Sequence, residues 1–295
     1  MSIHNSQPTT YHFWKMEGTG NDFIFFDGFT EEGQAFVATL TPARIQQICN
    51  RHFGIGGDGI IVLSRGNNAP LWMRYWNADG TIAEMCGNGL RCTMHFARMR
   101  GHHIQFQNTV ELPTGDMVVT VTPLTDDTYR VDMPRPIFER SMIPMTGEGD
   151  AHEKIEIDGK RWEGFGVNVG NPHFVIPVEE STEKLATTIG SQIEVHPLFP
   201  KKTNVEFAQI LSRSEAKLWV WERGVGITLA CGSGATATAA ALVKADKLDA
   251  DFPIAIHLPG GVLKLEVSSK TGDVTLTGSA RVAFEGDIVI AKNEA

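Results

Sequence analysis

Cysteine is scarce in this sequence, and the few that occur are spaced for neither a disulfide framework nor a metal site. The 295 residues include only Cys49, Cys86, Cys92 and Cys231, and no two of them form a C-x-x-C pair. Structural zinc sites take their ligands from closely spaced cysteines and histidines. The N-terminus is polar and lacks the apolar segment of an export signal, so we expect a cytoplasmic protein with reduced thiols.

The sequence also lacks a long apolar run and an excess of basic residues. No run of about eighteen apolar residues occurs, so no membrane-spanning helix is expected. The 35 acidic residues outnumber the 26 basic ones, and the net charge of −9 disfavours nucleic acid and anionic membranes as partners. The glycine-rich segment "GIGGDG" follows a predicted helix and precedes a predicted strand, which is the reverse of a nucleotide-binding loop.

One local arrangement does occur, and it occurs twice. "GTGNDF" at 18–23 matches "VGNPHF" at 169–174, and "CGNG" at 86–89 matches "CGSG" at 231–234. Strands, polar glycine turns and helices follow one another in the same order around both sets. Paired motifs in the same order at similar spacing indicate an internal duplication with a period of domain length. We therefore expect an α/β (α+β) protein with two similar domains, residues 12–133 with the return of residues 277–295, and residues 134–276, after a disordered tail at 1–11.

Each motif places a cysteine directly before a predicted helix, at 86 and at 231. Unpaired N–H groups and the helix dipole at such a position are able to lower a thiol pKa from about 8.5 to roughly 3.5–7.5. Gly87 and Gly232 allow backbone amides to approach a ligand carboxylate closely. Two cysteines on opposite walls of a cleft suit the inversion of a carbon centre, since one removes a proton and the other delivers one to the opposite face.

Together the segments "GTGNDF", "NADG", "AEMCGNGLRC", "GNPHF", "TNVEF" and "ERGVGITLACGSGA" closely resemble the diaminopimelate epimerase family, over about residues 12–291. The resemblance implies a cofactor-independent isomerase that interconverts LL- and meso-diaminopimelate for lysine and peptidoglycan precursor synthesis. It also implies two pseudo-symmetric domains, each a curled, largely antiparallel sheet around a central helix, and a homodimer. No metal is implied.

The resemblance also implies a role for individual residues. Cys86 and Cys231 would be the acid/base pair, and His173 and Glu222 would tune the pKa values of the two thiols. Arg223 would clamp the distal carboxylate of the substrate, and Glu222 would meet an ammonium group. The residues implied to bind substrate are Asn21, Asn77, Gly87, Asn88, Asn171, Asn204, Glu222, Arg223, Gly232 and Ser233.

Two positions depart from the family pattern, and other interpretations stay open. Gly59 and Ile227 stand where many relatives carry glutamine and glutamate. The asparagines could be turn residues, His173 a core histidine, and the pair at 222–223 a surface charge pair. The alternatives to diaminopimelate epimerase are a two-cysteine racemase of the proline or histidine type and a non-catalytic binding protein. Two matched cysteine motifs disfavour the last of these.

Overall fold

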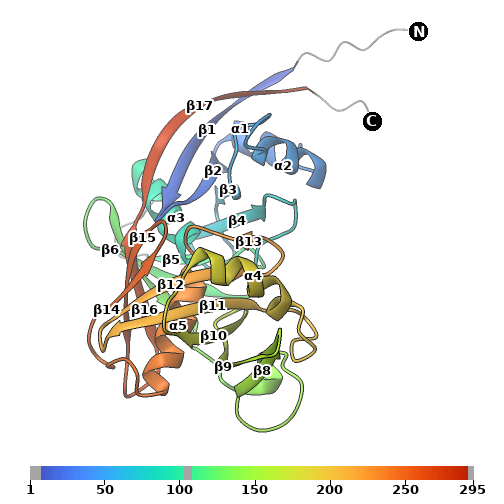
Figure 1. Ribbon diagram of the computed structural model, residues 1–295. Helices are drawn as coiled ribbons and strands as arrows, with labels where there is room; N and C mark the ends of the chain where they lie inside the picture. The colour runs from blue at the N-terminus through green and yellow to red at the C-terminus, as the bar shows by residue number, and fades with distance from the viewer. Residues whose placement is uncertain (1–7, 103–107, 292–295) are drawn as a thin grey trace.

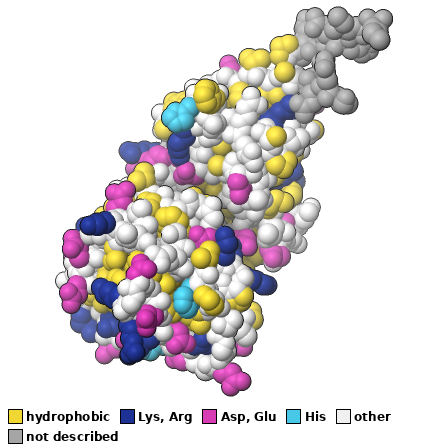
Figure 2. Space-filling model, turned by 45° about the vertical axis from the view of Figure 1, so that its right-hand side comes forward, with side chains coloured by type: hydrophobic (Ala, Val, Ile, Leu, Met, Phe, Trp, Pro, Cys, Tyr) yellow, Lys and Arg dark blue, Asp and Glu magenta, His cyan; other side chains and the backbone are white. Residues whose placement is uncertain are grey.

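The computed structural model describes residues 8–102 and 108–291. Its strands pair into one continuous, mostly antiparallel sheet that curls into two halves (Figure 1). In Figure 1 the first half of the chain lies above and the second below, and the last strand returns to the upper half. No helix in the described ranges is long and apolar enough to cross a membrane. Figure 2 shows acidic and basic side chains interspersed over one face of the molecule.

In its described residues, the N-terminal half has eight strands and three helices. Its strands are β1 (Thr9–Gly18), β2 (Asn21–Asp27), β3 (Gly59–Ser64), β4 (Leu71–Asn77), β5 (Thr109–Glu111), β6 (Val118–Pro123), β7 (Thr128–Met133) and β17 (Arg281–Ile290). Its helices are α1 (Glu31–Val37), α2 (Pro42–Cys49) and α3 (Gly87–Met99).

The C-terminal half repeats the eight strands but has two α-helices among the described residues, and it adds the short strand β13 (Gly226–Ile227) and the 3₁₀ helix η1 (Arg140–Met142). Its other strands are β8 (His152–Ile157), β9 (Lys160–Asn168), β10 (Pro172–Val178), β11 (Asn204–Ser212), β12 (Glu215–Glu222), β14 (Ile254–Leu258), β15 (Gly261–Val267) and β16 (Val274–Ser279). Its helices are α4 (Glu183–Glu194) and α5 (Gly232–Lys244).

The strand pairing of one half repeats in the other. In the order β17–β1–β2–β3–β4–β5–β6–β7 the ladders are antiparallel except for β2–β3 and β4–β5. In the order β8–β9–β10–β11–β12–β14–β15–β16 they are antiparallel except for β10–β11 and β12–β14, which hold the same places in the series. The pair β7–β16 joins the halves. This repeat supports the interpretation of the sequence as a duplication.

Helices α3 and α5 form the centres of the two halves. Almost every residue of both is buried, including Leu90 and Met94 on α3 and the run of small residues from Ala235 on α5. Small side chains let α5 lie close to the strands that surround it. The core around these helices is one continuous apolar cluster that spans both halves, while α2 and α4 each cover a separate smaller cluster. The mixed α/β fold with central helices agrees with the sequence-based expectation.

Two expected boundaries differ from the structure. The expected tail at 1–11 overlaps β1, which begins at Thr9 because its pairing with β17 starts there, and Tyr11 is buried; residues 1–7 lie outside the described residues. The returning segment was expected from residue 277, but residues 274–279 form β16, which pairs with β15 and β7. Only β17 returns. The short helix α1, whose start is capped by Thr30, was not expected from the apolar pattern.

Candidate active site

The two motif cysteines occupy the same structural position, the N-cap of a central helix. Cys86 precedes α3 and Cys231 precedes α5, both with extended backbone. Each sulfur accepts a hydrogen bond from the amide three residues on, at 3.3 Å from Gly89 N and 3.3 Å from Gly234 N. A Cβ at Gly89 would lie 3.3 Å from the Cys86 sulfur, so the glycine lets the amide come this close.

The two helix starts meet at the junction of the halves. The Nδ2 of Asn88 donates to the Ala230 carbonyl oxygen at 3.3 Å, which ties the α3 start to the residue before Cys231. A Cβ at Gly232 would lie 3.4 Å from the Gly87 Cα, so the residues that follow the two cysteines are in contact. Two cysteines 145 positions apart in the chain (231 − 86) are thereby brought to one place.

The expectation that both thiols have lowered pKa values is wrong for this structure. Burial raises the pKa of Cys86 to about 12, against the lowering effects of the Gly89 amide and Arg91. Burial also raises the pKa of Cys231 well above its usual value, and the nearby carboxyl groups of Glu222 and Glu206 add to the effect. Desolvation of the thiolate therefore outweighs the helix N-terminus, and both groups rest as neutral thiols.

Asn21 lies beside Cys86, and its orientation is set by a carboxylate that the sequence analysis missed. The Cys86 thiol donates to Asn21 Oδ1 at 3.7 Å, and Asn88 Nδ2 donates to the same oxygen at 3.3 Å. Asn21 Nδ2 donates to Asp58, which also accepts from Arg51 at 2.7 Å. Because an ionised carboxylate only accepts, Asp58 directs the carbonyl oxygen of Asn21 toward the thiol.

Asn171, the counterpart of Asn21, is connected to Cys231 by a longer chain. Cys231 Sγ lies 3.4 Å from Ser233 Oγ, and Asn171 Nδ2 donates to that hydroxyl at 3.4 Å. Asn171 Oδ1 lies 2.8 Å from His173 Nε2, and His173 Nδ1 lies 2.6 Å from Glu206 Oε1. Glu206 is part of the "TNVEF" segment but was not singled out, because a strand residue next to apolar neighbours gave no sign that it would face a histidine.

Glu222 lies at the end of β12 and affects both thiols. Its carboxyl accepts a hydrogen bond from Thr228 Oγ1. Burial raises its pKa to about 7, and the Thr228 hydrogen bond opposes that rise. Its charge raises the pKa of Cys86 and of Cys231, which places it near both. Glu222 is therefore in position for the tuning role that the resemblance implies.

The raised pKa of Glu222 makes the stability of the protein depend on pH. Because the folded pKa of about 7 exceeds the usual 4.5, the stabilisation from proton binding is complete below pH 4.5 and is lost as the pH rises through 7. Between pH 4.5 and pH 8, we expect the free energy of unfolding to fall in the wild type. In the Glu222→Gln variant it should fall by about 1–3 kcal/mol less. Urea unfolding at both pH values measures this. The control variant Glu148→Gln, on an exposed loop, should change the free energy of unfolding by the same amount at both pH values. If the two variants depended on pH in the same way, the raised pKa of Glu222 would be contradicted.

Arg223 follows Glu222 and reaches the other half of the molecule. Its Nη2 donates to Glu84 Oε2 at 2.9 Å, two residues before Cys86. Asn204 is buried, and its two amide ends are both engaged, with Nδ2 on the Pro172 carbonyl at 2.7 Å and Oδ1 on the Arg223 amide at 2.9 Å. Asn204 therefore holds the backbone of Arg223 in this structure.

The remaining predicted positions are distributed around these groups. Asn77 ends β4 in a turn, where its Nδ2 donates to Thr81 Oγ1 at 3.1 Å. Gly59 pairs with Asn77, and a Cβ there would lie 2.3 Å from the Trp76 carbonyl oxygen, so no larger residue fits this backbone. Ile227 packs on the apolar cluster under α4. The structure thus brings the motif residues together, and a direct substrate contact by Asn77 or Asn204 stays a prediction.

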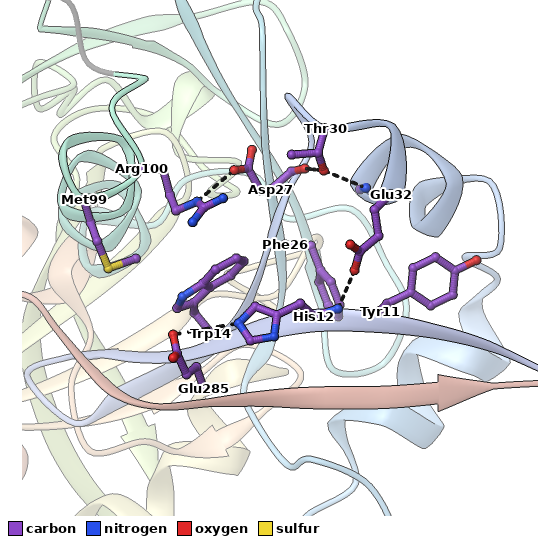
Figure 3. A pocket seen from close by; sticks show the side chains of 11 residues that line it. Tyr11, His12, Trp14, Phe26, Asp27, Thr30, Glu32, Met99, Arg100 and Glu285 are labelled. Carbon is purple, nitrogen blue, oxygen red and sulfur yellow. Dashed lines mark hydrogen bonds and ion pairs between the residues drawn. The ribbon is translucent and has the colours of Figure 1, made fainter.

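A cavity of about 440 Å³ also occurs in the N-terminal half (Figure 3). It lies between β1, β2 and the end of α3, and its lining includes neither motif cysteine. Arg100 lies over the Trp14 ring at 4.7 Å and donates to Asp27 at 3.0 Å, while the His12 amide donates to Glu32 at 2.6 Å. Arg100, Asp27 and Glu32 in this cavity therefore already have protein partners.

Comparison with known proteins finds a family model that matches most of the chain and relatives that match it over nearly their full length. The family model described as diaminopimelate epimerase matches residues 13–138 and 165–283. The chain is 40% identical to the diaminopimelate epimerase of Moorella thermoacetica, over 94% of this chain and 98% of that protein. It is 36% identical to that of Leptospira biflexa, over 95% of this chain and 99% of that protein.

Solved structures with a similar fold include a probable proline racemase from Agrobacterium radiobacter. It has a TM-score of 0.69 at 12% identity and covers 94% of this chain and 92% of its own. A hydroxyproline epimerase from Agrobacterium vitis has a TM-score of 0.70 at 11% identity and covers 96% and 92%. At these identities the likeness shows a shared fold.

Proposed function

The chain belongs to the diaminopimelate epimerase family, and on that premise we propose that it is an isomerase interconverting LL- and meso-diaminopimelate through two cysteines. The observation that carries the proposal is the contact between two equivalent helix starts, each capped by a cysteine. Inversion at one carbon needs an acid and a base on opposite faces of that carbon, and the pseudo-symmetry of the halves supplies one from each side.

In the proposed reaction one cysteine, as thiolate, removes the α-proton while the other, as thiol, protonates the opposite face. Negative charge then develops on the adjacent carboxylate. The first-turn amides of α3 and α5, at residues 87–88 and 232–233, would donate to it. The burial that raises both thiol pKa values also keeps water from the intermediate, so that the cysteines rather than solvent handle the proton.

We infer that Arg223 binds the carboxylate at the non-reacting end of the substrate. Its guanidinium pairs with Glu84, whose side chain is 54% exposed, so a substrate carboxylate is able to replace that partner at low cost. A guanidinium suits this role because its two parallel N–H donors fit one carboxylate.

Replacing Arg223 with lysine should weaken this contact. A point charge makes a single hydrogen bond where the guanidinium makes two, and hydrogen bonds to charged groups contribute about 1.5–3 kcal/mol each. We expect the Arg223→Lys variant to show a KM for diaminopimelate raised by about tenfold or more, with poorer discrimination against amino acids that lack a distal head. Steady-state kinetics would measure both. Glu84→Gln should leave KM unchanged or lower it, and unaltered kinetics of Arg223→Lys would contradict the role of the arginine.

Three further parts of the proposal concern the setting of the enzyme. We propose a cytoplasmic role in lysine and peptidoglycan precursor synthesis, consistent with the family. We also propose a homodimer, for which β17 offers an edge strand of ten residues with Phe284 and Val289 51% and 63% exposed. Edge strands of this length are suited to pairing with a second chain.

The function is tested by incubating the purified protein with LL-diaminopimelate, histidine or proline and following the optical rotation and α-hydrogen exchange of each. Of the three substrates, we expect the protein to convert only diaminopimelate. We also expect its activity to be undiminished after dialysis against a chelator. Preferential turnover of proline or histidine would instead identify a different two-cysteine racemase. Loss of activity with the chelator and recovery with a metal would contradict the cofactor-independent reaction.

A further inference from the structure

The most unusual polar group next to the site is the carboxyl of Glu206 on β11. Glu206 and His173 are both completely buried, and their side chains meet at 2.6 Å. The second carboxyl oxygen, Oε2, has no hydrogen-bond partner among the described residues. Burying a carboxyl with an unsatisfied oxygen costs free energy that an aliphatic side chain would not cost. A fold that needed only packing at this position would be more stable with an apolar residue.

The duplication supplies an internal control for this position. Strand β10 pairs with β11 as β2 pairs with β3, and the register sets His173 opposite Asn204 and Phe23 opposite Gly59. With Asn171 equivalent to Asn21, His173 corresponds to Phe23, and Glu206 then corresponds to Ile61.

The contact with the central helix agrees with this equivalence. A Cβ at Gly89 would lie 3.2 Å from Ile61 Cδ1, and a Cβ at Gly234 would lie 2.9 Å from Glu206 Oε1. Phe23 and Ile61 are fully buried in the apolar core of the N-terminal half. The fold therefore accommodates an apolar pair at these places, and the histidine–glutamate pair serves another purpose.

The pair connects to Cys231 by two routes. One is the chain of hydrogen bonds from His173 through Asn171 and the Ser233 hydroxyl to the sulfur. The other is the first turn of α5, where the Glu206 carboxyl lies against Gly234, whose amide is bonded to the same sulfur. Cys86 has no such pair, since Asp58 orients its asparagine directly.

The directions of these hydrogen bonds define where protons lie. Asn171 Nδ2 donates to Ser233, so Asn171 Oδ1 faces His173 Nε2, which must carry a hydrogen. His173 Nδ1 and Glu206 then share one further proton, either as an imidazolium with a carboxylate or as a neutral imidazole with a carboxylic acid. In both cases His173 Nε2 keeps its hydrogen toward Asn171 Oδ1, so the pair fixes the orientation of that amide.

We propose that Glu206 is a positioning residue for Cys231, which acts by holding His173 so that Asn171 and Ser233 keep their orientation toward the sulfur. The inference rests on the proposed function only in taking Cys231 as one of the two acid/base groups. Glutamine at position 206 keeps the shape and is able to donate to His173 Nδ1. Isoleucine copies the residue at the equivalent position of the N-terminal half and removes the hydrogen bond.

The test uses three variants, which are Glu206→Gln, Glu206→Ile and a double variant that combines His173→Phe and Glu206→Ile. The double variant reproduces the apolar pair of the other half. We expect the double variant to fold with an unchanged or higher Tm, and both isoleucine variants to lose about 10- to 100-fold in kcat with diaminopimelate. Glu206→Gln should stay within about threefold of wild type, because it preserves the hydrogen bond to the histidine. Wild-type kcat in the isoleucine variants, or an equal loss in Glu206→Gln, would overturn the positioning role.

A second readout does not depend on the substrate. Alkylation of each cysteine by iodoacetamide, followed by peptide mass mapping across pH, reports the titration of each thiol separately. The titratable groups around Cys231 are Glu206 on β11, Glu222 on β12 and His173 on β10. Glu206→Ile and Glu206→Gln both remove the carboxyl that raises the pKa of Cys231, and only glutamine keeps Ser233 oriented so that its hydroxyl favours the thiolate. We therefore expect the alkylation midpoint of Cys231 to move up by about one pH unit from Glu206→Gln to Glu206→Ile, while that of Cys86 stays in place.

The alkylation result separates failure of this inference from failure of the proposed function. If wild-type protein did not epimerise diaminopimelate, the selective shift of Cys231 would still support the positioning role. If the Cys231 midpoint did not move, or moved together with that of Cys86, the positioning role would be contradicted whatever the substrate.

Discussion

Substituting either motif cysteine with alanine should abolish epimerisation. Cys86 and Cys231 cap the two central helices from opposite halves, and in the proposed reaction each one handles the proton on one face of the carbon. With one cysteine missing, the remaining one is able to remove a proton and return it to the same face only. General acid or base groups contribute about 10²–10⁴-fold in rate, so we expect Cys86→Ala and Cys231→Ala each to lose about 10³-fold or more in kcat.

The matched controls are the two other cysteines, which are buried and cap neither central helix. Cys49 ends α2 in a separate apolar cluster, and Cys92 lies within α3. Cys49→Ala and Cys92→Ala should keep turnover near that of wild type, as measured by the interconversion of LL- and meso-diaminopimelate. A single alanine variant of the first pair that kept most of its activity would refute the two-base reaction.

A mild oxidant should inactivate the enzyme reversibly by joining Cys86 to Cys231. The residues after the two cysteines are already in contact, and a disulfide needs Cα atoms about 4.4–6.8 Å apart, which a small movement of the halves would provide. Both thiols are neutral at rest and the thiolate is the reacting species, so inactivation should be slow at neutral pH and faster as the pH rises. Substrate between the sulfurs should protect them.

Peptide mapping of the oxidised protein tests this directly. We expect a cross-link between the tryptic peptides of Cys86 and Cys231, complete loss of activity, and recovery with a thiol reductant. Cys49 and Cys92 should remain as free thiols, because Cys49 lies in the separate cluster under α2 and Cys92 is enclosed in the core within α3. The contrary result is an oxidised protein that is folded and inactive while the two motif cysteines are free or joined to other residues. That result would mean that Cys86 and Cys231 do not share a site.

The repeat motifs were sufficient to predict the central part of this fold. "CGNG" and "CGSG" each predicted a cysteine before a helix, and the structure places both at N-caps because glycine three residues on lets an amide reach the sulfur. The boundaries were less predictable. The course of β17 depends on pairing with β1 at the other end of the chain, and no local pattern encodes such a long-range contact.

The thiol pKa values and the carboxylates behind the asparagines could not be predicted from the motifs. A motif shows that a cysteine precedes a helix, but burial by the opposite half, which raises the thiol pKa, exists only in the folded molecule. Asp58 reaches Asn21 from 37 residues away in the chain, and Glu206 reaches Asn171 through His173, which is 33 residues away from Glu206. Their sequence neighbours, a glycine loop and an apolar strand, give no indication of these partners.

The central claim is that two different cysteines act on the two faces of one carbon, and deuterium incorporation measures it most directly. The enzyme is incubated with protiated LL-diaminopimelate in heavy water, and the α-deuterium of both epimers is followed by NMR or mass spectrometry from the earliest turnover. Since each thiol exchanges its proton with solvent separately, the account predicts meso product that carries deuterium while the remaining LL substrate is still protiated. Product that retains the original proton, or deuterium that enters both epimers equally from the start, would show a single group acting on both faces and would contradict the account.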